Sequence, residues 1–263
     1  MDESVFDMRW QNAWRAFVRE TITEADAACH TDAATFFWLK QDGSRVSALD
    51  LRLDAAVRVA LGRNFPDLAV LSEEVGLLAP TGHRGSLLAI VDPVDGTDSL
   101  LGRKRTWWVS IGILDGSRPI AGLIYQPTIR QAHDSAIPSK QRCERLVVGM
   151  SPDQLQSPDT ARMRESLRAE GADLVSTPHA VEKVASVLEG RCTAAVYLPS
   201  KKSPWWHAWD LAACLAIASA NDLLLTTLDG HPVRIEAQQT RRSDPWICAV
   251  DEGTWDMVLC SLQ

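Results

Sequence analysis

The chain has 263 residues, with 27 Lys and Arg against 34 Asp and Glu, so its formal net charge is −7. Its 46% hydrophobic and 23% charged residues are typical of a folded globular protein and argue against intrinsic disorder. The acidic balance argues against a protein that binds nucleic-acid polymers by neutralising phosphates, and no apolar run approaches the ~18–20 residues of a membrane helix.

The first 130 residues predict helices packed on a mixed or antiparallel sheet. Apolar residues recur at helical spacing from Val5 to Ile22, and a second helix is expected from Leu49 to Asn64, ended by Phe65-Pro66. Short apolar runs predict strands at 68–71 and 87–91, followed by a hairpin of 107–114 with 119–125.

The remaining residues, 131–263, predict alternating strands and helices. Strands are expected at 146–149, 174–175, 194–198, 223–226 and 247–250, and helices at 159–170, 181–189, 209–220 and 254–262. This alternation favours a largely parallel sheet with helices on its faces. The polar, irregular stretch Thr128–Arg145 is the expected boundary between the two halves of a mixed α/β protein.

The cysteines and the N-terminus predict a cytoplasmic protein. Six scattered cysteines form no CxxC pair, and a chain of this length needs no disulfides, so reduced thiols are expected. The opening residues, MDESVFDMRW, contain neither the basic region nor the apolar region of a secretory signal.

The most informative segment is Ile90–Leu100, IVDPVDGTDSL. An apolar strand ends in Asp92, and Gly96 permits a tight turn before Thr97 opens a short helix. Asp92 and Asp95, at i and i+3 across this turn, can converge, and they repel unless a proton or a cation lies between them. Mg²⁺ is bound by carboxylates together with substrate phosphate, and the amides after the turn suit an anion. The segment therefore predicts adjacent cation and phosphate sites.

Three further acidic positions are candidates, and each has a simpler explanation. Glu73-Glu74 follows a predicted strand and could be a solvated loop. Asp210 lies in the first turn of a predicted helix, and Asp50 lies at the start of another, so each could serve only as a helix cap.

Taken together, these motifs resemble the inositol monophosphatase family of Mg²⁺-dependent, Li⁺-sensitive phosphomonoesterases. DPVDGT has SEE upstream and AWDLAA downstream, and four longer segments resemble the family in the same order: LKQDGSRVSALD, FPDLAVLSEEVG, WWVSIGILDGSRPIAGLIYQP and VEKVASVLEGRCTAAVY. The resemblance spans nearly the whole chain. It implies a layered α/β/α/β/α sandwich that hydrolyses a small phosphate monoester with a metal-activated water.

The same resemblance implies a metal-binding set. Glu73 and Asp92 would bind a first ion with the carbonyl of Val94, and Asp92, Asp95 and Asp210 would bind a second. Two or three Mg²⁺ ions per site, inhibition by Li⁺ and a homodimer are expected on this ground. The half 1–130 would then carry most of the metal site, and the half 131–263 would carry Asp210.

Catalytic and phosphate-binding roles also follow from the resemblance. Thr97, oriented by Asp50, and Glu73 would activate the attacking water. The amides of Gly96 and Thr97 would hold the phosphate.

Substrate-side candidates lie after the motif and before Asp210. They are Asp98, Ser99, Lys201, Lys202, Trp205, Trp206 and His207. Lysines there could meet a second phosphate or carboxylate, and a tryptophan could stack on a base or sugar face. The alternative is a solvated loop, because exposed charge runs are usually only solvated.

Two departures from the family pattern leave the substrate open. The Gly-rich hairpin usual after the Y-x-P segment is missing from YQPTIRQAHDSAIPSKQRCERLVVG, and the motif continues as DSL. We expect an inositol, sugar or cyclitol phosphate, with a 3′-phosphonucleotide or histidinol phosphate as alternatives. A non-catalytic, metal-binding regulatory relative is an alternative of another class, although the complete acidic set argues against it, because converging carboxylates cost stability without a cation.

Overall fold

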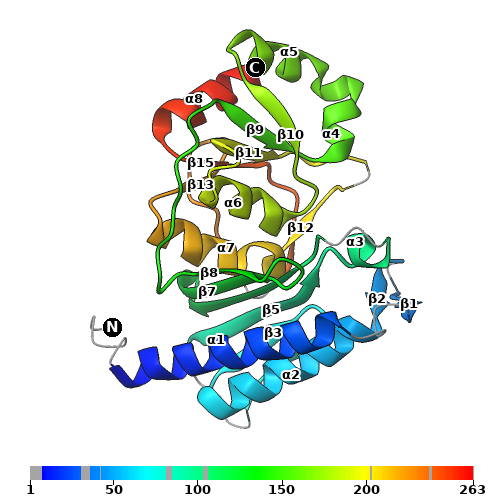
Figure 1. Ribbon diagram of the computed structural model, residues 1–263, viewed down its shortest axis with the longest axis vertical. Coiled ribbons are helices and arrows are strands. Elements are labelled where there is room, and N and C mark those ends of the chain that lie inside the picture. Colours follow the sequence, from blue (N-terminus) through cyan, green and yellow to red (C-terminus); the bar gives the residue numbers. More distant parts are fainter. Residues whose placement is uncertain are drawn as a thin grey trace.

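The structure, a computed structural model, describes residues 8–30, 36–41, 43–80, 85–102, 106–201, 203–236 and 239–262. Five layers stand one above another in Figure 1. From the bottom they are α1 (Met8–Cys29) with α2 (Ala48–Asn64), a six-stranded sheet, α6 (Ala180–Leu188) with α7 (Ala208–Ala220), a five-stranded sheet, and α5 (Ala161–Ala169) with α8 (Glu252–Ser261). The layered α/β/α/β/α sandwich is therefore confirmed.

The bottom layer forms because apolar residues recur at helical spacing. Trp14 and Phe17 on α1 are 1% and 0% exposed, and they pack with α2 in one core against the first sheet. Ser47 and Asp50 form a capping box that starts α2, and the helix ends at Asn64 as predicted. In this capping box Asp50 is only 1% exposed, and its position is important because Asp50 also bonds to Thr97 in the candidate site described below.

The first sheet has the strand order β4-β3-β5-β6-β7-β8. Its strands are β3 (Ala69–Ser72), β4 (Gly76–Leu78), β5 (Leu87–Asp95), β6 (Trp108–Asp115), β7 (Arg118–Gln126) and β8 (Gln131–Asp134). The pairing of β3 with β5 is parallel and the other pairings are antiparallel, including the predicted hairpin of β6 with β7. The strand β8 lies inside the stretch that the sequence predicted to be irregular. Its polar residues gave no apolar pattern that would predict a strand, although His133 is buried, with its Nε2 2.9 Å from Glu189 Oε1.

The second sheet has the order β10-β9-β11-β15-β13. Its strands are β9 (Val147–Met150), β10 (Asp173–Ser176), β11 (Ala194–Tyr197), β13 (Leu224–Thr227) and β15 (Trp246–Ala249). β9 is parallel to both neighbours, whereas β15 is antiparallel to β11 and β13. The sheet is thus less uniformly parallel than expected. The described chain between β13 and β15 contains no crossover helix, which a parallel return requires.

Smaller elements complete the chain. The sequence did not predict the short hairpin before α2 or the two-stranded ribbon before and after α7. The unpredicted hairpin consists of β1 (Phe37–Leu39) and β2 (Arg45–Ser47), and the unpredicted ribbon of β12 (Trp206–His207) and β14 (Arg241–Arg242). The other small elements are α3 (Thr97–Leu101), α4 (Pro152–Gln156) and a 3-10 turn at Pro158–Thr160. In the described residues, no helix is both long and apolar enough to cross a membrane.

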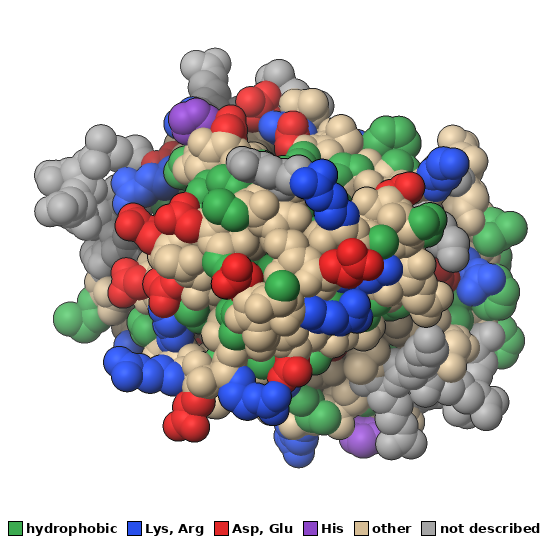
Figure 2. All heavy atoms as spheres, turned by 90° about the horizontal axis from the view of Figure 1, so that it is seen from above, with side chains coloured by type: hydrophobic (Ala, Val, Ile, Leu, Met, Phe, Trp, Pro, Cys, Tyr) green, Lys and Arg blue, Asp and Glu red, His purple; other side chains and the backbone are tan. Residues whose placement is uncertain are grey.

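The outermost helical layer faces the viewer in Figure 2. Acidic and basic side chains are interspersed over this face, and its apolar side chains are scattered. Such a mixed surface is ordinary for the solvated side of a helical layer.

Two glycines let α7 approach the first sheet closely. Gly112 on β6 and Gly122 on β7 are cross-strand partners. A Cβ at Gly112 would lie 2.4 Å from the carbonyl carbon of Ala212, and one at Gly122 would lie 2.4 Å from the carbonyl oxygen of Ala213. Both contacts are with the backbone of α7, which cannot move aside cheaply. These glycines therefore set how near α7 lies to the strand that carries Asp92.

We expect Gly122→Ala to destabilise the fold by about 1–3 kcal/mol, the usual cost of overpacking a core. Urea unfolding measures this loss. Gly62→Ala is the matched control, because Gly62 lies inside α2 with no atom within 4 Å of an added Cβ. This control should be neutral or stabilising by up to ~1 kcal/mol, as alanine is the better helix former. Equal effects of the two variants would contradict the close-approach explanation.

Candidate metal and phosphate site

The turn after β5 places two carboxylates at one end of the first sheet. The pairing of β5 with β6 shifts register between Asp92 and Asp95, so that both side chains can face the same region. Asp92 Oδ1 accepts a hydrogen bond from the Val94 amide at 2.9 Å. Gly96 has φ of +101°, a left-handed conformation that favours glycine, and Thr97 then opens α3. The predicted strand, turn and helix start are thus present.

A third carboxylate reaches the turn from the other half of the chain. Asp210 lies in the first turn of α7, where its Oδ2 accepts a hydrogen bond from the His207 amide at 2.7 Å. Carboxylate oxygens of Asp92, Asp95 and Asp210 all lie within 4.8 Å of one another. This cluster joins residues more than a hundred positions apart, because α7 packs directly on the first sheet.

Glu73 lies beside this cluster. It follows β3, the parallel neighbour of β5, and its amide donates to the carbonyl of Val91 at 3.0 Å. Lys40 Nζ lies 2.8 Å from Glu73 Oε1 and 3.0 Å from Glu74 Oε1. Lys40, which was not among the predicted site residues, therefore already places one positive charge against the acidic pair.

Burial and mutual repulsion make the acidic cluster a candidate cation site. Burial raises the pKa of Asp92 and of Asp95 well above the usual range, and neighbouring carboxylates raise both further. Burial also raises the pKa of Glu73, which Lys40 partly opposes and Asp210 reinforces. A hard divalent cation would relieve this repulsion, and the all-oxygen donor set suits Mg²⁺. The residues present therefore fit the ion that the sequence predicted.

Thr97 and Asp50 meet as the sequence predicted. Thr97 Oγ1 lies 2.8 Å from Asp50 Oδ1 and 3.2 Å from the carbonyl oxygen of Val94. The other oxygen of Asp50 is held by Ser47 at the start of α2, with the Ser47 amide at 3.0 Å. Asp50 is thus fixed by a helix cap on one side and accepts the threonine hydroxyl on the other. A hydroxyl bonded in this way keeps its lone pairs turned away from the carboxylate.

The start of α6 closes the turn from above. The Val181 amide donates to Asp95 Oδ2 at 3.3 Å, and His179 Nε2 lies 2.8 Å from Ser99 Oγ. The His179 ring also packs against Gly96, since a Cβ there would lie 2.9 Å from Nε2. His179 was missed at the sequence level, because no local pattern marks which residue of a helix start will face a distant loop.

Lys183, one turn further along α6, is a buried lysine of the second half. It is 1% exposed, and its Nζ donates to Ser151 Oγ at 3.0 Å and to Thr177 Oγ1 at 3.3 Å. Burial lowers the pKa of Lys183 to about 7, although Glu182 and other acidic groups partly oppose this. Its bonds tie the first turn of α6 to the ends of β9 and β10.

We expect Lys183 to give the protein a pH-dependent stability between about pH 7 and 10.5. Its folded-state pKa lies below the usual value of 10.5, so the unfolded chain binds more protons in this window and the free energy of unfolding rises with pH. The rise is at most about 1.4 kcal/mol per pH unit. Urea unfolding of wild type and Lys183→Met at pH 7 and pH 9 isolates this contribution. The same increase in both proteins would show that Lys183 is not its source.

The predicted substrate-side residues lie in different surroundings. Asp98 is exposed and pairs with Arg45 at 3.3 Å, while Ser99 is 8% exposed and bonds to His179. His207 lies on β12, with its Nδ1 3.8 Å from Asp210 Oδ2, and Trp205, the residue before β12, contacts Arg241. Trp206 is a correction, because it is 2% exposed in the core and its Nε1 donates to the carbonyl of Asp244.

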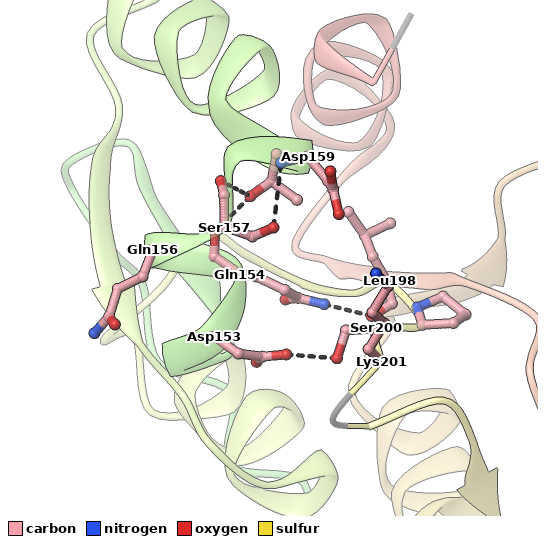
Figure 3. A pocket seen from close by; sticks show the side chains of 10 residues that line it. Asp153, Gln154, Gln156, Ser157, Asp159, Leu198, Ser200 and Lys201 are labelled. Carbon is pink, nitrogen blue, oxygen red and sulfur yellow. Dashed lines mark hydrogen bonds between the residues drawn. The ribbon is translucent and has the colours of Figure 1, made fainter.

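Of the two predicted lysines, only Lys201 lies within the described residues. Lys201 lines a separate cavity of about 310 Å³ between α4 and the loop after β11, shown in Figure 3. There Ser200 Oγ donates to Asp153 Oδ2 at 2.5 Å, and Gln154 Nε2 donates to the carbonyl of Leu198 at 2.6 Å. Lys202 lies outside the described residues.

Converging carboxylates beside a turn that opens a helix, with a helix-covered sheet on either side, form an arrangement that could hold the metal ions of a phosphatase. Residues 4–250 match the model of the inositol monophosphatase family, so the chain belongs to this family. It is a phosphoric monoester hydrolase, and the acidic cluster is where its family's Mg²⁺ fits.

Individual relatives differ in the substrates that their names state. The chain is 27% identical over 203 residues to the 3′(2′),5′-bisphosphate nucleotidase CysQ of Escherichia coli K12, covering 74% of this chain and 80% of the relative. It is 27% identical over 205 residues to the histidinol-phosphatase of Mycobacterium tuberculosis, covering 73% and 77%. The solved structure of SuhB from Bartonella henselae matches 96% of this chain and 98% of its own, with a TM-score of 0.74 and 18% identity. This last likeness supports the fold.

Proposed function

We propose that the chain hydrolyses a small sugar, cyclitol or inositol phosphate with two Mg²⁺ ions. Glu73, Asp92 and the carbonyl of Val94 would hold one ion, and Asp92, Asp95 and Asp210 the other. The observation that carries the proposal is the convergence of the three aspartates within 4.8 Å beside the turn at Gly96. The carboxyl repulsion described above is of the kind that a divalent cation relieves.

The surrounding residues would position the reactants. The amides of Gly96 and Thr97 lie at the start of α3. Because the first amides of a helix have no carbonyl partner within the helix, these two can bind phosphate oxygens. The Thr97 hydroxyl, which donates its proton in a hydrogen bond to Asp50, can accept a hydrogen bond from a water and so orient it for in-line attack. Bound Mg²⁺ lowers the pKa of water and stabilises charge on the transferring phosphate. Glu73 would assist at the same water.

A 3′-phosphonucleotide is the second candidate substrate, and one observation favours it. Trp205, the residue before β12, is 47% exposed, and the guanidinium carbon of Arg241 lies 5.4 Å from the centre of its ring. An exposed aromatic face can stack on a base. The named activity of the CysQ relatives points the same way, as that of histidinol-phosphatase does for histidinol phosphate.

Phosphate release from a panel of monoesters tests the proposal. The panel contains inositol phosphates, sugar phosphates, histidinol phosphate and 2′-, 3′- and 5′-nucleotides, each with and without Mg²⁺. Mg²⁺-dependent release from one class would support the function and name the substrate class. Silence together with an absence of Mg²⁺ binding would favour the non-catalytic alternative.

Several finer expectations remain proposals. The number of bound ions, inhibition by Li⁺ and a homodimer rest on family membership, and a cytoplasmic location rests on the scattered cysteines and the N-terminal residues. Inhibition by Li⁺ is tested by adding Li⁺ to the phosphate-release assay. The homodimer is tested by light scattering of the purified chain.

A further inference from the structure

A cavity of about 380 Å³ lies at the edge of the first sheet and is lined by residues of α1, β7 and α7. The strand β8 pairs only with residues 123–126 of β7, so residues 118–121 form a free edge in the described structure. The residues of α7 that reach this edge, Ala216, Ser219 and Ala220, are small and leave the space open. The volume is typical of a site for a small molecule.

The cavity and the acidic cluster lie toward opposite ends of the first sheet. Arg118, which lines the cavity, pairs with Asp115 on β6, and Asp115 pairs in turn with Leu87 at the start of β5. Asp95 ends the same strand, roughly 25 Å further along at about 3.3 Å per residue. A ligand in the cavity would therefore not touch the proposed metal ligands.

Two exposed arginines line the cavity with unpaired guanidinium groups. Arg15 belongs to α1 and Arg118 to β7, and neither side chain forms an ion pair or a hydrogen bond within the part of the chain that the structure describes. Asp115, the cross-strand partner of Arg118, bonds to Ser86 instead. Because a guanidinium presents five donors in a fork that fits phosphate oxygens, the two groups are free to bind an anion.

Two hydroxyls add further donors to the same cavity. Ser135 Oγ accepts a hydrogen bond from the Gly122 amide at 2.9 Å, which leaves its own proton to donate. Ser219 is exposed near the end of α7, and its hydroxyl has no bond to another described residue. Among the described lining residues none carries a carboxylate, although the chain has a net charge of −7. The lining is therefore locally suited to a negative charge.

The cavity also has an apolar wall. Trp10 and Trp14 both line it, and their rings are stacked with centroids 6.0 Å apart and an interplanar angle of 17°. Trp14 Nε1 donates to Asp134 Oδ1 at 2.8 Å, so this neighbouring carboxylate is already bonded. Pro119 and Ile120 on the edge of β7 extend the apolar surface. Such a wall can pack against a flat apolar group.

We infer that this cavity binds a small molecule in which a dianionic group such as phosphate is attached to a flat apolar body. The dianion would meet Arg15 and Arg118, and the apolar body would pack against Trp10. Binding here needs no metal ion, because the protein itself supplies the positive charge. The inference goes beyond the proposed function and does not depend on it.

Calorimetric titration with phenylphosphonate in the presence of EDTA tests the inference. This probe carries a dianion on an aromatic ring, and it has no phosphate ester to hydrolyse. Without a divalent cation the acidic cluster repels anions, so binding under these conditions reports on the cavity. Wild type should bind phenylphosphonate at least about tenfold more tightly than methylphosphonate, which lacks the ring. Arg15→Gln and Arg118→Gln should each weaken binding by about tenfold, as expected for a lost charge-assisted hydrogen bond.

A matched control and three outcomes decide the result. Arg162→Gln makes the same charge change on exposed α5 and should leave binding unchanged. The inference would be overturned by no saturable binding up to about 10 mM probe, by equal affinity for the two phosphonates, or by binding that survives both Arg15→Gln and Arg118→Gln. None of these measurements uses phosphate release, so a failure of this inference is distinguishable from a failure of the proposed function.

Discussion

Replacing Asp95 by Asn is expected to remove both Mg²⁺ binding and phosphate release. Asp95 contributes an oxygen to the cluster with Asp92 and Asp210, and an amide cannot supply the same negative charge. Losing metal-derived charge stabilisation worth several kcal/mol corresponds to at least about 10³-fold in kcat. Stopped assays of phosphate release from the best panel substrate measure the loss.

Thermal unfolding with and without Mg²⁺ gives a readout that does not need a substrate. Wild type should be stabilised by about 2.7 kcal/mol at a Mg²⁺ concentration one hundred times its Kd, and Asp95→Asn should show almost none of this. Without Mg²⁺ the variant should be more stable than wild type, because one of the repelling carboxylates is gone. Asp256→Asn, on the exposed side of α8, is the matched control. Unchanged Mg²⁺ stabilisation in Asp95→Asn would remove this residue from the metal site.

Gly96→Ala is expected to disable the phosphate-binding turn while sparing the carboxylates. Gly96 has φ of +101°, and an added Cβ would lie 2.9 Å from His179 Nε2 and 3.1 Å from the carbonyl oxygen of Thr106. Holding a non-glycine residue in this conformation costs about 1–3 kcal/mol. The turn would shift to relieve the contacts, and a misplacement of about 1 Å can cost roughly 10²-fold in rate.

A double variant separates the two causes of that loss. In Gly96→Ala/His179→Ala the contact with the imidazole is gone, whereas the backbone strain and the contact with Thr106 remain. Unfolding experiments should therefore show partial recovery of stability relative to Gly96→Ala alone. Mg²⁺ stabilisation should persist in both variants. An activity within threefold of wild type in Gly96→Ala would show that the turn tolerates the change and does not grip the phosphate.

The fold could largely be predicted because its elements depend on local patterns. The stripe of α1 with Trp14 and Phe17, the hairpin of β6 with β7, and the alternating elements after β9 are each encoded by neighbouring residues. The elements missed, such as β8 and the ribbon of β12 with β14, are short and polar. Their hydrogen-bond partners come from other parts of the chain, so no local periodicity marks them.

The sequence by itself was enough to predict the family and to select the acidic residues that are candidates for metal binding. The conformation of a turn such as Asp92–Thr97 depends on residues within a few positions of each other. The order of this turn after Glu73 and before Asp210 can be read directly from the sequence. Local chemistry at Asp50 likewise predicted a helix cap. These features need only short-range sterics and hydrogen bonding.

Only the tertiary structure decided which side chains surround those carboxylates. Gly112 and Gly122 let α7 lie close to the first sheet, and this packing brings Asp210 to the turn. The placement of His179 against Gly96, and of His207 between Asp210 and Arg241, follows from how the two sheets enclose α6 and α7. Such contacts depend on the packing of whole layers, which no local sequence pattern encodes.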